Sequence, residues 1–286
     1  MEWLNNNKIP LGAWISDFVD FLDEYAGGFF DLISVVLSFF IEGSIDAMAW
    51  CHPLVLIGII CGIAWYLHRS WVLCVSIVLA LLLIINMGYW QETIETLALV
   101  LFATVICLFV GVPLGIAAAH RPWLYTILRP ILDLMQTIPT FVYLIPTLIL
   151  FGLGVVPGLI STVIFALPAP VRLTYLGISS VPKPLIEAGQ SFGASKQQLL
   201  WKVELPHAMS TIMAGITQSI MLSLSMVVIA ALVGADGLGK PVVRALNTVN
   251  IEKGFEAGLA IVIVAILLDR ICKQRQNANT ALTNDK

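Results

Sequence analysis

Long apolar segments separated by short polar connectors dominate this sequence and restrict what it can fold into. A helix needs roughly 20 mainly apolar residues to cross the hydrocarbon core of a bilayer. Seven candidate segments of about this length are present: 47–67, 71–90, 93–119, 130–152, 156–178, 207–233 and 254–271. A bilayer offers no water to backbone N–H and C=O groups, so such segments are expected to be helical. The sequence therefore predicts an all-α integral membrane protein with about seven transmembrane helices.

The composition supports a membrane protein and excludes several other classes. Hydrophobic residues make up 59% of the chain and charged residues 12%, about half the roughly 25% charged residues of soluble domains. A soluble fold of this length could not bury so much apolar surface. The net charge of −3 gives no reason to expect nucleic acid as a partner. No basic stretch followed by an apolar one opens the chain, so a cleaved signal peptide is not expected.

The N-terminal segment 1–46 is acidic and amphipathic. Apolar residues such as Trp14 and Phe18 alternate with aspartates and a glutamate up to Tyr25, which indicates a helix with one wet face. Residues 28–42 repeat this pattern, with polar residues spaced three and four apart in a short apolar run. We predict two amphipathic helices here, external or interfacial, or packed against the bundle. A crossing of the membrane by residues 28–42 is the alternative.

Lysine and arginine are distributed unequally among the connectors, which allows a prediction of orientation. If the connector 180–206 is cytoplasmic, eleven of the 15 basic residues are inside: Arg69, Arg121, Arg129, Arg172, Lys183, Lys196, Lys202, Arg270, Lys273, Arg275 and Lys286. The positive-inside rule then predicts an external N-terminus and a cytoplasmic C-terminus. We divide the chain into the segment 1–46, two peripheral transmembrane helices at 47–90, a core transmembrane domain at 91–271 and a cytoplasmic tail at 272–286.

The connector 180–206 is predicted to form two short helices that meet at Gly193. Glycine is suited to the left-handed conformation that ends a helix. Ser195 can accept from the N–H of Gln198 while the Gln198 side chain reaches back, which is a capping box. Pro206 is expected to end the second helix. These local features also fit an amphipathic connector lying on the membrane surface.

Helix-breaking residues are concentrated in the middle of the chain, and breaks of this kind inside lipid are tolerated where protein or a water-filled cavity satisfies the backbone. We therefore expect the central helices to line a path. The candidate path residues are Asp133, Gln136, Thr137, Pro139, Ser223 and Ser225. Asp133 and Gln136 share a helix face because they are three residues apart. As alternatives, Asp133 pairs with Arg129, and the serines serve helix packing.

The sequence shows no plausible nucleotide or metal site. Residues 234–241 nearly match the phosphate-binding pattern G-x4-G-K-[ST], but Pro241 supplies no hydroxyl for Mg²⁺ and an apolar helix precedes the segment instead of a strand. The histidines and cysteines are scattered without metal-ligand spacing and without a C-x-x-C pair. We expect no cofactor and no catalytic residue on this chain.

The connector also carries a longer pattern that resembles a known family. Glu187, Ala188 and Gly189 are followed at fixed intervals by Gly193, Val203, Leu205 and Pro206. This spacing resembles the EAA loop, E-A-A-x3-G-x9-I-x-L-P, of permease subunits of ATP-binding-cassette (ABC) importers. Gly189 departs from the second alanine and Val203 from the isoleucine. Stretches including 129–144, 164–168, 191–195 and 222–230, with 237–239, further resemble one branch of these permeases, the quaternary-ammonium transporters of the glycine betaine, choline and proline type.

The resemblance implies the fold and the partners. It implies a type I importer permease in the bacterial inner membrane, as two copies around a path in the lipid bilayer. A separate ATP-binding subunit would use ATP and Mg²⁺ and dock on the EAA-like loop. Glu187 and Gly193 are the first residues to which the resemblance assigns this docking role. An external substrate-binding protein would deliver choline or glycine betaine.

Two other classes compete with this interpretation. An ion-coupled secondary transporter or channel would share the composition, but it requires coupling carboxylates near the bilayer midplane, and the segment interiors are nearly free of them. A membrane-embedded enzyme or respiratory subunit requires cofactor or metal ligands that the histidines and cysteines do not offer. The ABC permease accounts for the loop, the orientation and the missing nucleotide site together.

Overall fold

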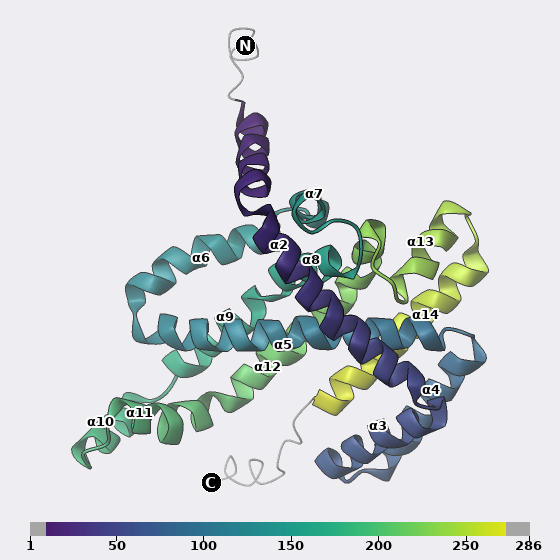
Figure 1. Cartoon of the computed structure of the whole chain (residues 1–286). Helices are drawn as coiled ribbons and strands as arrows, with labels where there is room; N and C mark the ends of the chain where they lie inside the picture. Colours follow the sequence, from purple (N-terminus) through teal and green to yellow (C-terminus); the bar gives the residue numbers. More distant parts are fainter. Residues whose placement is uncertain (1–9, 273–286) are drawn as a thin grey trace, which may run out of the picture.

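The structure is a computed structural model that describes residues 10–272, a range that contains helices and turns and no strand (Figure 1). The elements in chain order are α2 (Leu11–Trp50), α3 (Pro53–His68), α4 (Trp71–Asn86), α5 (Trp90–His120), α6 (Pro122–Thr137), α7 (Thr140–Phe151), α8 (Val155–Ala166), α9 (Pro168–Ser179), α10 (Lys183–Ser191), α11 (Lys196–Leu199), the π-helical segment η1 (Leu200–Glu204), α12 (Leu205–Ala230), the 3₁₀ segment η2 (Ala231–Val233), α13 (Gly239–Asn247) and α14 (Ile251–Cys272). The predicted all-α class is confirmed. The predicted tail beyond Cys272 and the first nine residues of the predicted N-terminal segment lie outside the described residues.

Four helices within residues 10–272 are long and apolar enough to cross a membrane: Gly12–Trp50, Trp90–His120, Val155–Ser179 and Lys196–Val233. The pair α6 and α7 becomes a fifth if the two are counted as one bent span. Helices α3 and α4 are apolar but have only 16 residues each, and α14 carries charged residues at both ends. A multi-pass protein is supported, and the number of crossings, about seven, stays a prediction.

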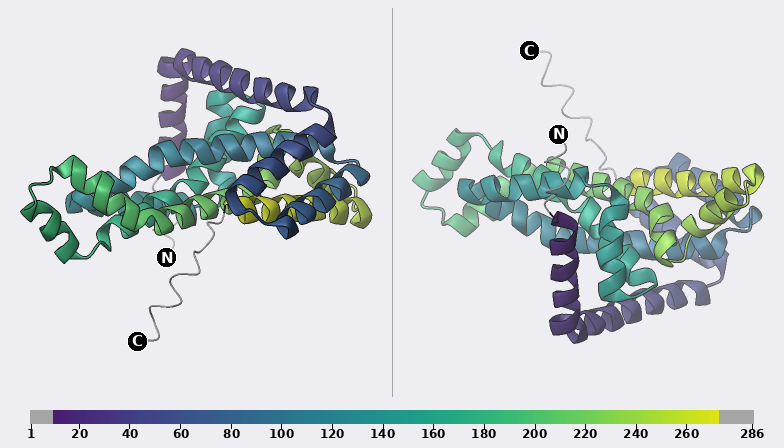
Figure 2. Two further views of the ribbon diagram at one scale, coloured as in Figure 1. Left: turned by 90° about the horizontal axis from the view of Figure 1, so that it is seen from below. Right: turned by 90° about the horizontal axis from the view of Figure 1, so that it is seen from above.

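Residues 11–50 form one helix of 40 residues, so the division of the N-terminal segment into two helices was wrong. The turns around Gly27 and Gly28 keep helical hydrogen bonding, and Figure 2 shows α2 turning a corner in its first half. A glycine pair is a common place for such a kink. The predicted first span also began too early, because residues 47–50 belong to α2.

The predicted span 130–152 was also wrong as a single helix. Helices α6 and α7 meet at an angle of 97°. The break falls at Ile138 and Pro139, where Ile138 has the extended backbone that a following proline imposes (ψ 130°). Pro139 has no N–H to continue the helical ladder. The opposite outcome holds for Pro113, around which α5 stays continuous.

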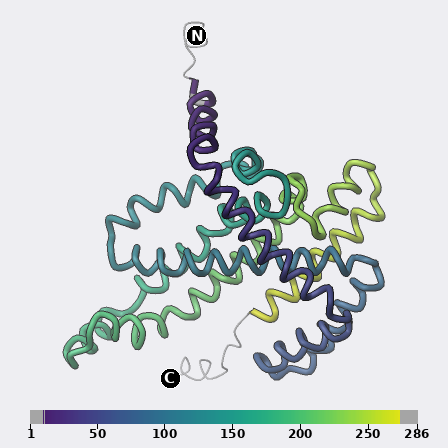
Figure 3. The backbone as a smooth tube through the Cα atoms, in the orientation of Figure 1, coloured from purple at the N-terminus to yellow at the C-terminus, as the bar shows by residue number. Residues whose placement is uncertain are grey.

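Helices α5, α9 and α12 pack on one another in the middle of the molecule (Figure 3). Glycine allows the close approach of α5 to α9. A Cβ atom on Gly115 would lie 2.6 Å from Cβ of Thr174 and 2.7 Å from the carbonyl oxygen of Val171. Gly111 is likewise buried in α5, against Pro170 of α9. Small residues therefore serve helix packing at this crossing.

The segment 234–241, which resembled a nucleotide loop, is a turn over residues 234–238 that packs against α5, followed by the first residues of α13. Gly234 and Gly237 have positive φ angles of 93° and 121°. The backbone N–H of Leu238 donates to Oγ1 of Thr96 at 2.8 Å, and both residues are fully buried. The backbone donor of Leu238 is therefore used in the fold, and α13 begins directly after it.

Candidate coupling loop and translocation path

Helices α10 and α11 form a hairpin (residues 183–199) at one end of the molecule, beyond the ends of α5 and α9 (Figures 1 and 2). Pro182 precedes α10 and Pro184 lies in its first turn, where a missing N–H costs no hydrogen bond. No residue of α10 is buried, and Glu187 and Ala188 are exposed. The EAA-like residues therefore lie on an accessible helix.

The turn between the two helices is fixed by local hydrogen bonds. Gly193 has a φ angle of 77°, and its N–H donates to the carbonyl oxygen of Gln190 at 2.9 Å. Ser195 and Gln198 form both bonds of a capping box, with lengths of 2.8 and 3.3 Å. These predictions are confirmed, because they depend only on residues a few positions apart. The backbone at Gly193 is one that side chains with a Cβ rarely adopt.

Gly189 explains how closely the two helices approach. A Cβ atom at this position would lie 2.6 Å from Cδ2 of Leu199, which is 5% exposed on the inner side of the hairpin. The residue that departs from the family pattern is therefore a contact position. An alanine there would require the end of the Leu199 side chain to move.

The outer surface of the hairpin region exposes large apolar side chains. Leu185 is 47% exposed, Phe192 91% and Trp201 69%. Lys196 and Lys202 are also exposed, as the amphipathic pattern predicted. An apolar surface beside charged residues on a protruding element is typical of a site that binds another protein or the membrane surface.

Pro206 does not end the second helix, so this prediction was wrong. The chain continues from α11 through η1 into α12, and Pro206 lies in the first turn of α12. In η1 the N–H of Leu205 reaches back to the carbonyl oxygen of Leu200, a wider π turn that accommodates the proline. Val203 and Leu205 are half-buried, so these two pattern residues pack inward while Pro206 is exposed.

Glu204 is the residue that sequence reasoning missed. It is 7% exposed, and its Oε2 lies 2.9 Å from Nε2 of His120 at the end of α5. The sequence offers one weak signal, a carboxylate placed directly before Leu205 and Pro206. Its partner is too distant along the chain to be identified from a pattern.

Asp133 is paired with Arg172 of α9, not with Arg129 as the alternative proposed. The distance from Arg172 Nη2 to Asp133 Oδ1 is 2.6 Å, and both side chains are partly exposed. The rings of Tyr125 and Tyr175 stack between the same two helices with centroids 3.6 Å apart. An ion pair and an aromatic stack therefore join α6 to α9.

The other candidate path residues do not form one surface. Gln136 is half-buried, and Thr137 and Pro139 are exposed at the end of α6, where the Thr137 hydroxyl donates to the Asp133 carbonyl. Ser223 is fully buried in α12, and its hydroxyl has no hydrogen-bond partner within residues 10–272. Ser225 is exposed and donates to the carbonyl oxygen of Met221. The two serines therefore face different surroundings.

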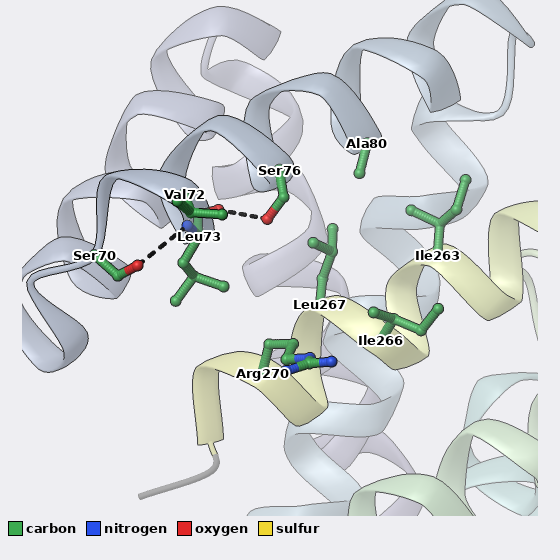
Figure 4. Close-up of a pocket in the computed structure, with 9 residues that line it drawn as sticks. All are labelled: Ser70, Val72, Leu73, Ser76, Ala80, Ile263, Ile266, Leu267 and Arg270. Carbon is green, nitrogen blue, oxygen red and sulfur yellow. Dashed lines mark hydrogen bonds between the residues drawn. The ribbon is translucent and has the colours of Figure 1, made fainter. Parts of the chain in front are cut away.

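A groove of about 540 Å³ lies between α4 and α14 (Figure 4). Its lining is apolar apart from Ser70, Ser76 and Arg270. Both serine hydroxyls are hydrogen-bonded to the backbone of Leu73 in α4. Arg270 is the one charged side chain among the lining residues. Within residues 10–272, no group of three or more histidine, cysteine or acidic side chains could hold a metal ion.

Residues 111–272 match the family described as "Binding-protein-dependent transport system inner membrane component". The chain is 48% identical to the glycine betaine transport system permease protein OpuAB of Bacillus subtilis, over 92% of this chain and 93% of that protein. It is 48% identical to the glycine betaine/carnitine transport permease protein GbuB of Listeria monocytogenes, over 93% and 95%. A structure of the MetNI methionine ABC transporter in an inward-facing conformation aligns with a TM-score of 0.55 and 24% identity, covering 61% of this chain and 88% of that one.

Proposed function

The chain belongs to the family of binding-protein-dependent transport system inner membrane components, the permeases of ABC importers, and we propose that it imports glycine betaine or a closely related quaternary ammonium compound. The similarity to OpuAB and GbuB over nearly the whole length of each chain carries this proposal. Carnitine is the next candidate, since the name of GbuB includes it. Choline has less support among these relatives.

The α10–α11 hairpin is the proposed docking surface for a separate ATP-binding subunit. Glu187, Ala188 and Phe192 are exposed there, while Gly189 and Gly193 set the shape of the hairpin. The remaining pattern residues, Val203, Leu205 and Pro206, connect it to α12. This proposal assigns ATP, Mg²⁺ and the hydrolysis of ATP to the partner, and gives this chain a transport role alone.

Two copies of the chain surround the path, and an external substrate-binding protein delivers the substrate to it. The break between α6 and α7 and the Asp133–Arg172 pair support a path near these helices. Gln136, Thr137 and Pro139 lie at the same break and stay in the proposed lining. Ser225 is accessible, whereas Ser223 requires a movement of α12 to reach a path.

The orientation follows from the hairpin. A cytoplasmic ATPase requires α10 and α11 inside, which places the C-terminus inside as well. The external N-terminus stays a prediction, as does the division at 46, 90 and 271. The packing of α2 supports a different orientation of the N-terminus. Ile41 is fully buried beside Ala98 and Ala103 of α5 and Leu159 of α8. A helix packed in this way throughout its second half would cross the membrane and place residue 12 inside.

Cysteine labelling in intact cells distinguishes these arrangements. In a chain whose five cysteines are replaced, Lys183→Cys should react with an impermeant maleimide only after permeabilisation. Gly12→Cys should react in intact cells if the N-terminus is external. Protection of Gly12→Cys until permeabilisation would show that α2 crosses.

Reconstitution with a matching ATP-binding subunit and binding protein tests the function. Proteoliposomes should accumulate radiolabelled glycine betaine only with ATP, and carnitine and choline compete in parallel assays. Glu187→Ala should lower uptake by about tenfold or more, as for a contact at the centre of an interface. Gln190→Ala, an exposed residue of the same helix, is the control. Uptake driven by an ion gradient without ATP would instead support a secondary transporter.

A further inference from the structure

Arg172 is the one charged residue in a long apolar span. Helices α8 and α9 together form the membrane-spanning candidate Val155–Ser179, and every other residue in it is uncharged. A charge inside a membrane segment is costly and commonly marks the path of a substrate or an ion. Asp133, the single acidic residue of α6, pairs with it. The protein therefore holds one charge of each sign in helices where charged residues are rare.

The hydrogen bond between these two residues uses only part of their bonding capacity. Nη2 of Arg172 donates to Oδ1 of Asp133 at 2.6 Å, and the second carboxylate oxygen, Oδ2, takes no part in that bond. Nε of Arg172 is buried and has no partner within residues 10–272, although each guanidinium nitrogen carries a hydrogen to donate. A buried donor without a partner is destabilising. An acceptor placed beside Nε would therefore be favourable.

The pair is also accessible from outside the chain. The side chains of Arg172 and Asp133 are 35% and 51% exposed. Asp133 lies one turn before the end of α6, and α7 then leaves at an angle of 97°. Gln136 is half-buried on the same helix face as Asp133 and adds an amide. A small polar solute can therefore reach both charges.

We propose that Asp133 and Arg172 form a binding site for a zwitterion that carries a quaternary ammonium group and a carboxylate. The carboxylate of the solute takes the place of Asp133 on the guanidinium, where it can accept two hydrogen bonds, one of them from Nε. The quaternary ammonium group then faces the released carboxylate of Asp133. This inference rests on the proposed function, whose substrate, glycine betaine, has both groups.

A site of this kind distinguishes zwitterions from ligands with a single charge. Choline has a quaternary ammonium group but no carboxylate, so its binding would separate the ion pair and leave Arg172 without a partner. The carbon isostere of glycine betaine, in which a tert-butyl group replaces the trimethylammonium group, would leave Asp133 without one. Separating an ion pair without replacing both partners is unfavourable. The site should therefore reject ligands that lack either group.

Protection of a cysteine from alkylation tests the site without the external binding protein. In the chain whose five cysteines are replaced, Gln136→Cys places a thiol one turn from Asp133. The complex with the ATP-binding subunit, in nanodiscs, is treated with a small polar maleimide at rising ligand concentrations. Glycine betaine should slow the alkylation, and choline and the carbon isostere should require about tenfold higher concentrations or more, as for one lost charged hydrogen bond. Lys183→Cys, on the exposed α10, is the control and should show no protection.

Two substitutions in the Gln136→Cys chain assign the two charges. Arg172→Gln should raise the glycine betaine concentration required for protection by about tenfold and should not raise that of choline, so that the preference for the zwitterion is lost. Asp133→Asn should raise the concentrations of glycine betaine and choline and should not raise that of the carbon isostere. Arg129→Gln, an exposed arginine of α6 outside the pair, should leave all three concentrations unchanged.

The ligand comparison decides the proposal even if a substituted chain fails to fold. Equal protection by all three ligands, or by none, overturns the zwitterion site. Equal losses for glycine betaine and choline in Arg172→Gln would assign the pair a purely structural role and also overturn it. ATP-driven uptake by the reconstituted importer separates the two proposals. Absence of uptake of any quaternary ammonium compound overturns the proposed function, whereas glycine betaine uptake without selective protection overturns the zwitterion site alone.

Discussion

Individual buried hydroxyl groups contribute differently to the stability of this bundle, and Thr96 and Thr104 of α5 illustrate the difference. Thr96 accepts a hydrogen bond from the N–H of Leu238, which has left the regular helices. Thr104 only donates to the carbonyl oxygen of Val100 in its own helix. That carbonyl also lies in the helical ladder, so the Thr104 bond is an extra one. The first bond satisfies a buried donor, and the second does not.

Thr96→Val should therefore destabilise the protein by about 1–3 kcal/mol, the cost of leaving a buried donor unsatisfied. Thr104→Val has the same change of atoms and should have a much smaller effect. Thermal unfolding of both variants in detergent measures the difference. Equal stability losses in the two variants would contradict the assigned role of Thr96.

Gly193 offers a second prediction at the residue scale, because its constraint is the backbone alone. No atom lies within 4 Å of the place a Cβ would occupy, but its φ is 77°. Valine should be strained by about 1–2 kcal/mol in this conformation, whereas asparagine adopts it more readily. Gly193→Val should lower ATP-driven uptake while membrane insertion stays normal, and Gly193→Asn should lower it less. The reverse order would show that side-chain contact with the ATPase decides the effect.

At the scale of elements, the crossing of α5 and α9 depends on the absence of a side chain at Gly115. An added methyl group would meet Thr174 and the backbone of Val171 at once, so the helices would have to separate. We expect Gly115→Ala to cost about 1–3 kcal/mol, as overpacking does. Gly258→Ala in α14 has open space around the new methyl group and should be neutral or slightly stabilising. Comparison of the two melting temperatures in detergent tests the packing argument.

The α6–α9 contact is the second element-scale feature with a measurable consequence. Asp133 and Arg172 are partly exposed, so their pair contributes modestly to stability. Its position beside the α6–α7 break makes a role in transport the larger expectation. Asp133→Asn should lower glycine betaine uptake several-fold with little change in melting temperature. A stability loss that fully accounts for the lost uptake would assign the pair to structure alone.

At the scale of the whole molecule, the chain exposes apolar side chains on α6 and α7, including Ile131, Phe141 and Ile145. Lipid or another protein must cover them. We expect native mass spectrometry of the solubilised complex to give two permease chains of 31.2 kDa with two ATP-binding subunits. A complex with one permease chain would contradict the paired arrangement.

Features with local or compositional causes could be predicted from the amino-acid sequence. The apolar runs required helices because backbone groups cannot stay unsatisfied in lipid. The turn at Gly193 and the capping box at Ser195 follow from the conformational freedom of glycine and from a hydroxyl within reach of the helix end. The EAA-like spacing pointed to the family for the same reason, because it lies within one short connector.

Contacts between groups that are distant along the chain could not be predicted in this way, because they depend on how the helices pack. Arg172 and not Arg129 became the partner of Asp133 because α9 packs beside α6. The Glu204–His120 contact depends on the path of α5, and periodicity cannot reveal it. Proline has local effects that depend on neighbours: Pro139 breaks a helix, whereas a π turn accommodates Pro206. Spacing along one chain fixes local hydrogen bonds, and the packing of separate helices fixes the rest.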